Sequence, residues 1–314
     1  KFVGPFNQQL IKKLFPIFLI LNALLLPLII FFSSSFLTQL ISAIIEGIIF
    51  ILIIEALKKI YNNEKYLKPR FSNIKITVFG INGCHDAIKS SIIDVNQVII
   101  ERNSPADISE KMHTALIEIP QNLIEKVDSE SFKRYVDNNR AQGIYIKAQA
   151  KTFHELPIVE NETACFVVLD QVQDPHNLGQ ILRICAGGNI DGVVITDRNS
   201  VSMTSAVAQV SQGGFSKVPL FSVTNINKAI GHFKDNDFWI TSFENNIEAK
   251  DWYAIDLKGR SVLIFGGEGS GISKQVLKNS DFLATIPMSH DMNSLNVATA
   301  VSAIVFERLR QVLS

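Results

Sequence analysis

The chain has 314 residues, of which 47% are hydrophobic and 19% are charged, and this length predicts about two domains. Thirty Lys and Arg balance thirty Asp and Glu, so the chain has no net positive charge with which to attract nucleic acid. Only a local basic patch could bind it. The chain has three cysteines, Cys84, Cys165 and Cys185, and they form no C-x-x-C pair, which indicates reduced thiols in a cytoplasmic protein. None of the six histidines has the spacing of a metal-binding motif, so no metal site is predicted.

Residues 1–60 form a hydrophobic extension unlike the rest of the chain. Two almost wholly apolar runs, 14–32 and 36–57, are each about long enough to cross a bilayer. A lysine pair precedes the first run and another follows the second, which predicts a transmembrane hairpin with both ends in the cytoplasm. Because the sequence begins at Lys1 instead of Met, spurious translation of this segment is an equal alternative.

A small α/β unit is predicted over residues 73–150. It begins with a strand, a glycine turn and a helix start in IKITVFGINGCHDAI. Further strands are expected in VNQVIIERN and AQGIYIKAQA, with a mixed segment between them. Residues 151–164, with Pro157 and scattered charge, are interpreted as a connector.

Strands and helices alternate over residues 160–314. CFVVLD is continuously apolar, as expected for a strand buried in a parallel sheet. NLGQILRICAGG is predicted to form a helix that ends at glycine, with Arg183 pointing away from its apolar stripe. Further strands are expected in DGVVITD, FWITSF, SVLIFGG and FLATIPM, and further helices in NINKAIGHF, SKQVLKN and residues 295–312. This alternation predicts an α/β fold with a doubly wound parallel sheet.

Three stretches follow predicted strands at the edge where open α/β sheets bind ligands. They are LDQVQDPHNLGQILRICA at 169–186, IFGGEGSGIS at 264–273, and the segment from IPM through SLNVATAVSAI at 286–304. Taken alone, each has an ordinary structural explanation. Ser294 or Asn296 can cap the last helix, and Arg183 can be a solvated helix arginine.

The glycine-rich loop does not have the pattern of a phosphate-binding loop. Its spacing, Gly267-x-Gly269-x-Gly271, matches neither G-x-G-x-x-G nor G-x-x-x-x-G-K, and the carboxylate of Glu268 would repel a pyrophosphate. A ligand with little or no negative charge fits better, such as adenosine joined to a sulfonium-bearing amino acid.

Together the three stretches resemble the motifs of the SpoU (TrmH) family of RNA ribose 2′-O-methyltransferases. The matching patterns are D-x-V-x-D-P-x-N-x-G-x-x-x-R, F-G-x-E-G-x-G and I-P-M…S-L-N-V-x-x-A, in this order across about residues 165–314. The unit at 73–150 resembles the family's L30e-like substrate-binding domain, which is typical of the branch that methylates guanosine in 23S rRNA. Residues 1–60 match nothing in the family.

The resemblance implies a trefoil-knotted (SPOUT-type) methyltransferase domain over residues 160–314. It implies S-adenosyl-L-methionine (AdoMet) as methyl donor, RNA as partner, rRNA more than tRNA, and a homodimer formed through the knotted domain. A membrane is a partner only if residues 1–60 are expressed and inserted. By match to the family's motifs, the catalytic positions are Asn177, Arg183, Glu268, Ser294 and Asn296. The positions implied to hold AdoMet are Gly266, Gly267, Gly271, Ile286, Met288 and Leu295.

Arg183 is expected to clamp an RNA phosphate and polarise the ribose hydroxyl, because a guanidinium holds its proton too tightly to act readily as a general base. Two departures from the family pattern concern, in turn, the target nucleotide, which stays open, and the geometry of the loop before Ser294. Gly214 and Ser216 stand where rRNA-type members commonly have alanine and glutamate, and SHDMN replaces a more glycine-rich stretch before Ser294. The alternatives are a tRNA ribose 2′-O-methyltransferase and a non-catalytic RNA-binding member. The glycine spacing argues against a dinucleotide-binding oxidoreductase.

Overall fold

The computed structural model describes residues 70–136, 138–245, 249–269, 271–289, 292 and 294–314. The hydrophobic extension predicted over 1–60, with its transmembrane hairpin, lies outside these residues. Among the helices that are described, none combines the length and the apolar composition that crossing a bilayer requires.

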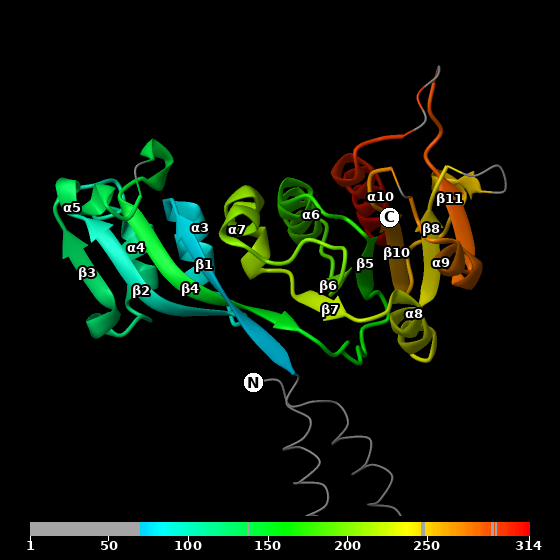
Figure 1. The fold of residues 1–314 in the computed structure, drawn as a ribbon, viewed down its shortest axis with the longest axis horizontal. Helices are drawn as coiled ribbons and strands as arrows, with labels where there is room; N and C mark the ends of the chain where they lie inside the picture. The colour runs from blue at the N-terminus through cyan, green and yellow to red at the C-terminus, as the bar shows by residue number, and fades with distance from the viewer. Residues whose placement is uncertain (1–69, 137, 246–248, 270, 290–291, 293) are drawn as a thin grey trace, which may run out of the picture. The chain divides into compact units, whose positions relative to one another are not determined.

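A parallel sheet forms the centre of the C-terminal part (Figure 1). Its strands, in their order across the sheet, are β7 (Leu220–Val223), β6 (Gly192–Thr196), β5 (Cys165–Asp170), β10 (Ser261–Gly266), β8 (Trp239–Phe243), β11 (Phe282–Thr285) and β9 (Lys250–Asp251). Every neighbouring pair in this row runs parallel. The strand β5 is buried along its whole length, as its continuous apolar sequence predicted.

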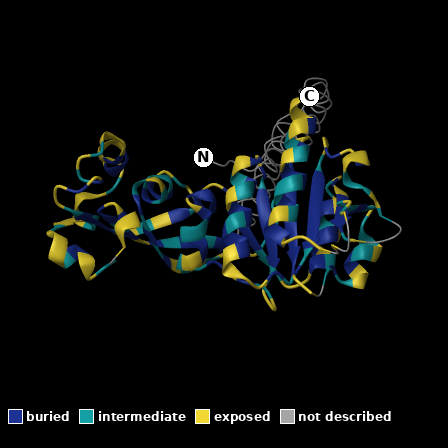
Figure 2. Ribbon diagram, turned by 90° about the horizontal axis from the view of Figure 1, so that it is seen from above, coloured by how far each residue is buried: buried dark blue, intermediate teal, exposed yellow. Residues whose placement is uncertain are grey.

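Helices pack on both faces of this sheet, as predicted for a doubly wound arrangement. One hydrophobic core joins Val167 of β5 to helices α6 (Pro175–Gly187), α7 (Ser205–Ser211) and α10 (Val297–Leu313). Its neighbour Phe166 belongs to a second core with α8 (Ile226–Lys234) and α9 (Lys274–Asn279). Adjacent side chains of a strand point to opposite faces, so a continuous apolar strand supplies both cores. Figure 2 shows buried strands beside helices that carry buried and exposed residues on different sides.

The segment between β6 and α8 was not predicted to contain regular structure, but it contains α7, a 3-10 turn (Gly214–Ser216) and β7. α7 has only seven residues, which is too short a window to show a clear helical period. The side chain of Thr204 caps its start by accepting a hydrogen bond from the amide of Val207. The 3-10 turn packs against α6. A Cβ atom on Gly214 would lie 2.7 Å from the backbone of Arg183, so alanine at this position would force a shift.

The small N-terminal part is a mixed sheet with helices. Its elements are β1 (Phe71–Phe79), α3 (Ile81–Ile88), β2 (Ile93–Glu101), α4 (Glu110–Leu116), β3 (Ile124–Val127), α5 (Ser129–Lys133) and β4 (Ile144–Phe153). β4 pairs antiparallel with both β1 and β2, and β2 pairs parallel with β3. The glycine turn predicted after the first strand is present, because Gly80 adopts a φ of +86° between β1 and α3.

The two parts share one sheet, which the sequence pattern did not predict. β4 runs to Phe153, into the segment interpreted as a connector, and pairs parallel with β7. The Oγ of Ser90 donates to the carbonyl of Ser216 over 2.6 Å, and Asp86 pairs with Lys217 over 2.9 Å. Burial raises the pKa of the Asp86 carboxyl, but hydrogen bonds and charge from Lys217 and His85 outweigh it and hold that pKa below its usual value.

Candidate active site

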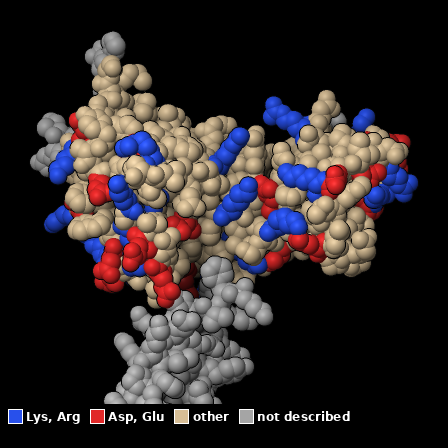
Figure 3. Space-filling view, turned by 180° about the vertical axis from the view of Figure 1, so that it is seen from behind, with Lys and Arg blue, Asp and Glu red and all other residues tan. Residues whose placement is uncertain are grey.

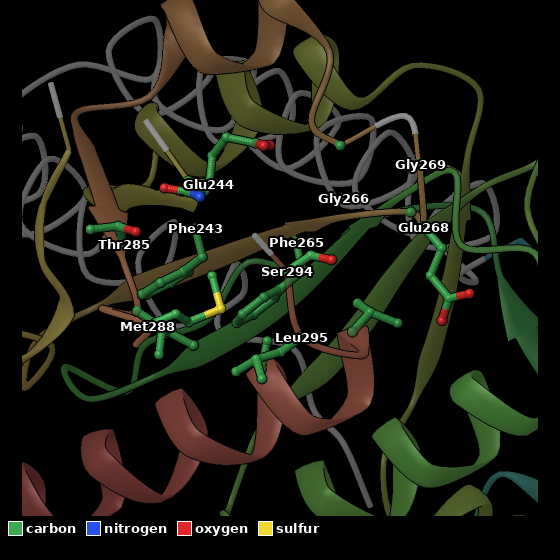
Figure 4. A pocket seen from close by; sticks show the side chains of 16 residues that line it. Phe243, Glu244, Phe265, Gly266, Glu268, Gly269, Thr285, Met288, Ser294 and Leu295 are labelled. Carbon is green, nitrogen blue, oxygen red and sulfur yellow. The ribbon is translucent and has the colours of Figure 1, made fainter. Parts of the chain in front are cut away.

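The three stretches that follow β5, β10 and β11 meet at the carboxyl edge of the parallel sheet, and β8 lies between β10 and β11. A pocket of about 400 Å³ lies at this edge (Figure 4). The predicted site residues that line it are Gly266, Gly267, Glu268, Gly271, Ile286, Met288, Ser294 and Leu295. Sheet topology therefore brings two of the three stretches into one wall.

Tight packing explains the glycines of the loop after β10. A Cβ atom on Gly267 would lie 2.3 Å from the carbonyl oxygen of Gln171, and one on Gly266 would lie 2.1 Å from the carbonyl carbon of Gly271. The amide of Gly267 donates to the carbonyl of Asp170 over 2.7 Å. Gly271 adopts a φ of +62°, which favours glycine. The loop folds back on itself, so the pocket wall there is backbone with little side chain.

Two carboxylates hold the end of this loop. Oδ2 of Asp170 accepts from the amide of Ser273 and Oε2 of Glu244 accepts from the amide of Ile272, each over 2.9 Å. Asp170 is buried and anchors β5 to the start of α9. Glu244 also lines the pocket, and sequence reasoning missed it. The available signal was a single acidic residue directly after an apolar strand.

Asn177, Glu268 and Asn296 form a closed hydrogen-bonded group. Nδ2 of Asn177 donates to Oε1 of Glu268 over 3.0 Å. Nδ2 of Asn296 donates to the same oxygen over 3.2 Å and to Oδ1 of Asn177 over 2.9 Å. Asn177 is buried, whereas Glu268 is exposed, and no described residue donates a hydrogen bond to its Oε2. Two amides therefore fix one carboxylate oxygen and leave the other to a ligand or solvent.

The helix cap predicted before the last helix is confirmed for Asn296. Its Oδ1 accepts from the amides of Ala298 over 2.9 Å and Thr299 over 3.3 Å, at the start of α10. Ser294 makes no such cap and lines the pocket instead. One side chain of Asn296 thus serves both the helix and the polar group, so the capping and the site interpretations of this residue are compatible.

Arg183 forms no hydrogen bond with this polar group in the described part of the chain. It is exposed on α6 and lines a separate groove of about 750 Å³, to which Gly80 and Arg140 of the small part contribute. Among the described residues, two arginines, one histidine, six Asn or Gln side chains and no carboxylate line this groove. Among them, Oε1 of Gln209 is buried without a described hydrogen-bond partner. The groove therefore suits an anionic ligand with hydrogen-bonding edges.

The pocket has the opposite electrostatic character. Glu244 and Glu268 line it, and no Lys, Arg, His or Cys is among the described residues of its wall. Burial raises the pKa of Cys165, which lies elsewhere, to about 12. Within the described ranges, no group of three His, Cys, Asp or Glu could hold a metal ion. Such a pocket can bind and orient a neutral or cationic ligand, and it offers no activated thiol for covalent catalysis.

The chain resembles known proteins over the part that contains this site. The sequence model described as the SpoU rRNA Methylase family matches residues 164–306. A protein of Xylella fastidiosa named 23S rRNA (guanosine-2′-O-)-methyltransferase RlmB is 31% identical over 244 residues, which cover 74% of this chain and 96% of that protein. A Staphylococcus aureus protein named as a TrmH family tRNA/rRNA methyltransferase is 32% identical over 235 residues, covering 72% of this chain and 93% of the relative.

Solved structures share the fold. The SpoU methyltransferase AviRb from Streptomyces viridochromogenes, crystallised with AdoMet, superposes with a TM-score of 0.64 at 18% identity and covers 76% of this chain and 91% of its own. An rRNA methyltransferase from Sinorhizobium meliloti, also with AdoMet, gives a TM-score of 0.63 at 19% identity, over 76% of this chain and 88% of its own.

Proposed function

The chain belongs to the SpoU rRNA methylase family, and from this premise we propose that it transfers a methyl group from AdoMet to a ribose 2′-hydroxyl of 23S rRNA. The observation that carries the proposal is the hydrogen-bonded group of Asn177, Glu268 and Asn296 beside a pocket walled by glycine backbone. These residues stand far apart in the sequence and occupy the family's three motifs. The X. fastidiosa relative is named for a guanosine of 23S rRNA, which supports that substrate.

The pocket fits AdoMet. Glycine backbone and the apolar side chains of Phe265, Ile286 and Leu295 suit a purine nucleoside, and a wall with two carboxylates and no described cation favours a sulfonium over a pyrophosphate. Gly266, Gly267, Gly271, Ile286, Met288 and Leu295 are the residues we propose to hold it. When bound, AdoMet supplies a methyl group already activated by the positive sulfur.

The residues of the chain then have to orient the ribose and accept the proton of its 2′-hydroxyl. Asn177 and Asn296 fix Oε1 of Glu268, so that Oε2 can accept a hydrogen bond from the 2′-hydroxyl and aim its oxygen at the methyl carbon. Alignment of this kind, with an acceptor for the proton, is the contribution that a methyl transfer from an activated donor requires. The hydroxyl of Ser294 faces the same pocket and is assigned to ligand binding there.

Arg183 is proposed to clamp an RNA phosphate in its groove. The groove combines guanidinium groups with amide side chains, which suit phosphates and the edges of unstacked bases. This groove is the local basic patch that a chain without net charge needs in order to bind RNA. On the face drawn in Figure 3, Lys and Arg are interspersed with Asp and Glu, so electrostatic attraction there is not spread over one broad surface.

The finer architecture is also a proposal. We infer that residues 160–314 are the methyltransferase domain, with a trefoil knot through the loops after β10 and β11, and that 73–150 is an L30e-like RNA-binding domain. Support comes from Gly267, which packs onto Asp170 and Gln171, and from the mixed β-sheet with α3 and α4. A homodimer through the knotted domain and action in the cytoplasm complete the proposal, the latter supported by three free thiols.

The test is methyl transfer from labelled AdoMet to separated 23S rRNA, 16S rRNA and tRNA from a strain that lacks this gene. Label in 23S rRNA that is lost with Arg183→Ala is the expected result. Label only in tRNA would keep the chemistry and overturn the substrate, which matters because the S. aureus relative is named for both RNAs. Bound AdoMet without label in any pool would favour a non-catalytic member.

A further inference from the structure

Glu244 has no part in the chemistry proposed above, yet its carboxylate belongs to the wall of the pocket (Figure 4). We propose that Glu244 accepts hydrogen bonds from the ribose hydroxyls of the adenosine cofactor and so makes the pocket selective for a ribonucleoside. This inference rests on the proposed AdoMet site.

The backbone and side chain of Glu244 are held in place. It follows β8, and its amide donates to the carbonyl of Ala284 in β11 over 3.0 Å. Its Oε2 accepts from the amide of Ile272. A Cβ atom on Gly271 would lie 2.9 Å from Oε2 and 3.1 Å from Oε1, so the carboxylate packs directly against this glycine. An ordered acceptor therefore faces the pocket.

The charge of Glu244 lacks a partner in the described part of the chain. No described cation forms an ion pair with it, none lines the pocket, and no described residue donates to its Oε1. Its side chain is half-buried, so water compensates its charge only in part. A carboxylate has about four acceptor sites and is stabilised when donors fill them, so a ligand with hydrogen-bond donors satisfies Glu244 best.

The position of Glu244 indicates which donors these are. Figure 4 shows Glu244 and Glu268 on different sides of the pocket, with Phe243, Phe265 and Leu295 among the other side chains that line it. The reacting methyl belongs at Glu268, so the nucleoside extends toward Glu244. Two vicinal hydroxyls give one carboxylate two donors, which is the chemistry by which acidic residues after a strand recognise ribose in other nucleotide-binding folds.

The experiment compares two ligands by isothermal titration calorimetry: S-adenosyl-L-homocysteine and its analogue without the ribose 2′- and 3′-hydroxyls. The wild-type protein is expected to prefer the hydroxylated ligand at least about tenfold, and Glu244→Gln to reduce this preference to about twofold. Glutamine keeps an acceptor for the amide of Ile272, so the loop contact survives. The ratio of two affinities is insensitive to any general weakening of the pocket. Glu268→Gln is the matched control and should retain the preference.

Three results would overturn the inference. An unchanged preference in Glu244→Gln would make Glu244 a clamp for the loop only. The second is that Glu244→Gln lowers the affinity for both ligands equally but leaves the affinity for methylthioadenosine, which lacks the amino-acid portion, unchanged. In that case the carboxylate binds the ammonium group of the cofactor. If the wild-type protein binds no S-adenosyl-L-homocysteine, the proposed cofactor fails together with this inference, whereas the first two results leave the cofactor standing.

Discussion

The side chain of Asn296 has two roles that substitution can separate. Its Oδ1 caps α10, and its Nδ2 donates to Asn177 and Glu268. Asn296→Asp keeps the capping oxygen, because Asp and Asn are comparable N-caps, but it replaces the donor by a second carboxylate. At the present 3.2 Å, two like charges repel by about 5 kcal/mol at an effective dielectric constant of about 20 and by about 1 kcal/mol in water. Since Glu268 is exposed, the smaller value applies, and the carboxylate is expected to turn away.

The lost hydrogen bonds to a charged group correspond to about 1.5–3 kcal/mol, so methyl transfer by Asn296→Asp should fall about 10- to 100-fold. Asn296→Asp and Asn296→Ala both lose the hydrogen bonds of the amide from the folded state, so Asn296→Ala, which also lacks the cap, should have a free energy of unfolding about 1 kcal/mol below that of Asn296→Asp. Urea unfolding and single-turnover methyl transfer measure the two effects separately. Asn296→Ser, which can cap but cannot donate as the amide does, is the decisive variant. Wild-type transfer by this variant would refute the role of the amide, and equal destabilisation by Asp and Ala would refute the cap.

The other predictions concern the glycine loop, the RNA clamp and the junction of the two parts. Gly267→Ala is expected to weaken AdoMet binding at least about tenfold in calorimetry, because its Cβ meets a carbonyl at 2.3 Å, whereas Gly259→Ala, with open space around it, is a neutral control. Arg183→Lys should lower kcat/KM at least about tenfold, because lysine lacks the bidentate fork, and near-normal activity would argue against the clamp. The lowered pKa of Asp86 means that its contribution to stability is present above the unfolded value near 3.8 and disappears as the pH falls through the folded pKa. The excess in melting temperature of wild type over Asp86→Asn should therefore begin to shrink as the pH falls below about 4 and be lost once the pH lies below the folded pKa, and an excess that does not shrink as the pH falls would contradict this ion-pair account.

Most strands and helices could be predicted because their patterns are long enough to read. The apolar strand β5 and the helix α6, with Leu178 and Cys185 buried and Arg183 exposed, lie where the sequence indicated. α7 and β7 could not be predicted, because elements of seven and four residues carry too little periodicity and depend on contacts with α6 and β4. The pairing of β4 with β7 rests on two residue pairs that no local pattern marks.

The sequence by itself determined the α/β alternation, the glycine-rich loop and the identity of the polar side chains that the family motifs share. Local propensity and short-range spacing decide these features. Only the tertiary structure decided which side chains meet. Asn177 and Asn296 are separated by 119 residues, and they touch because β5, β10, β8 and β11 lie side by side and end at one edge. The same order of strands brings Glu244 into the pocket and leaves Arg183 in a different groove, since the position of a side chain across a sheet depends on strand order, which the sequence does not display locally.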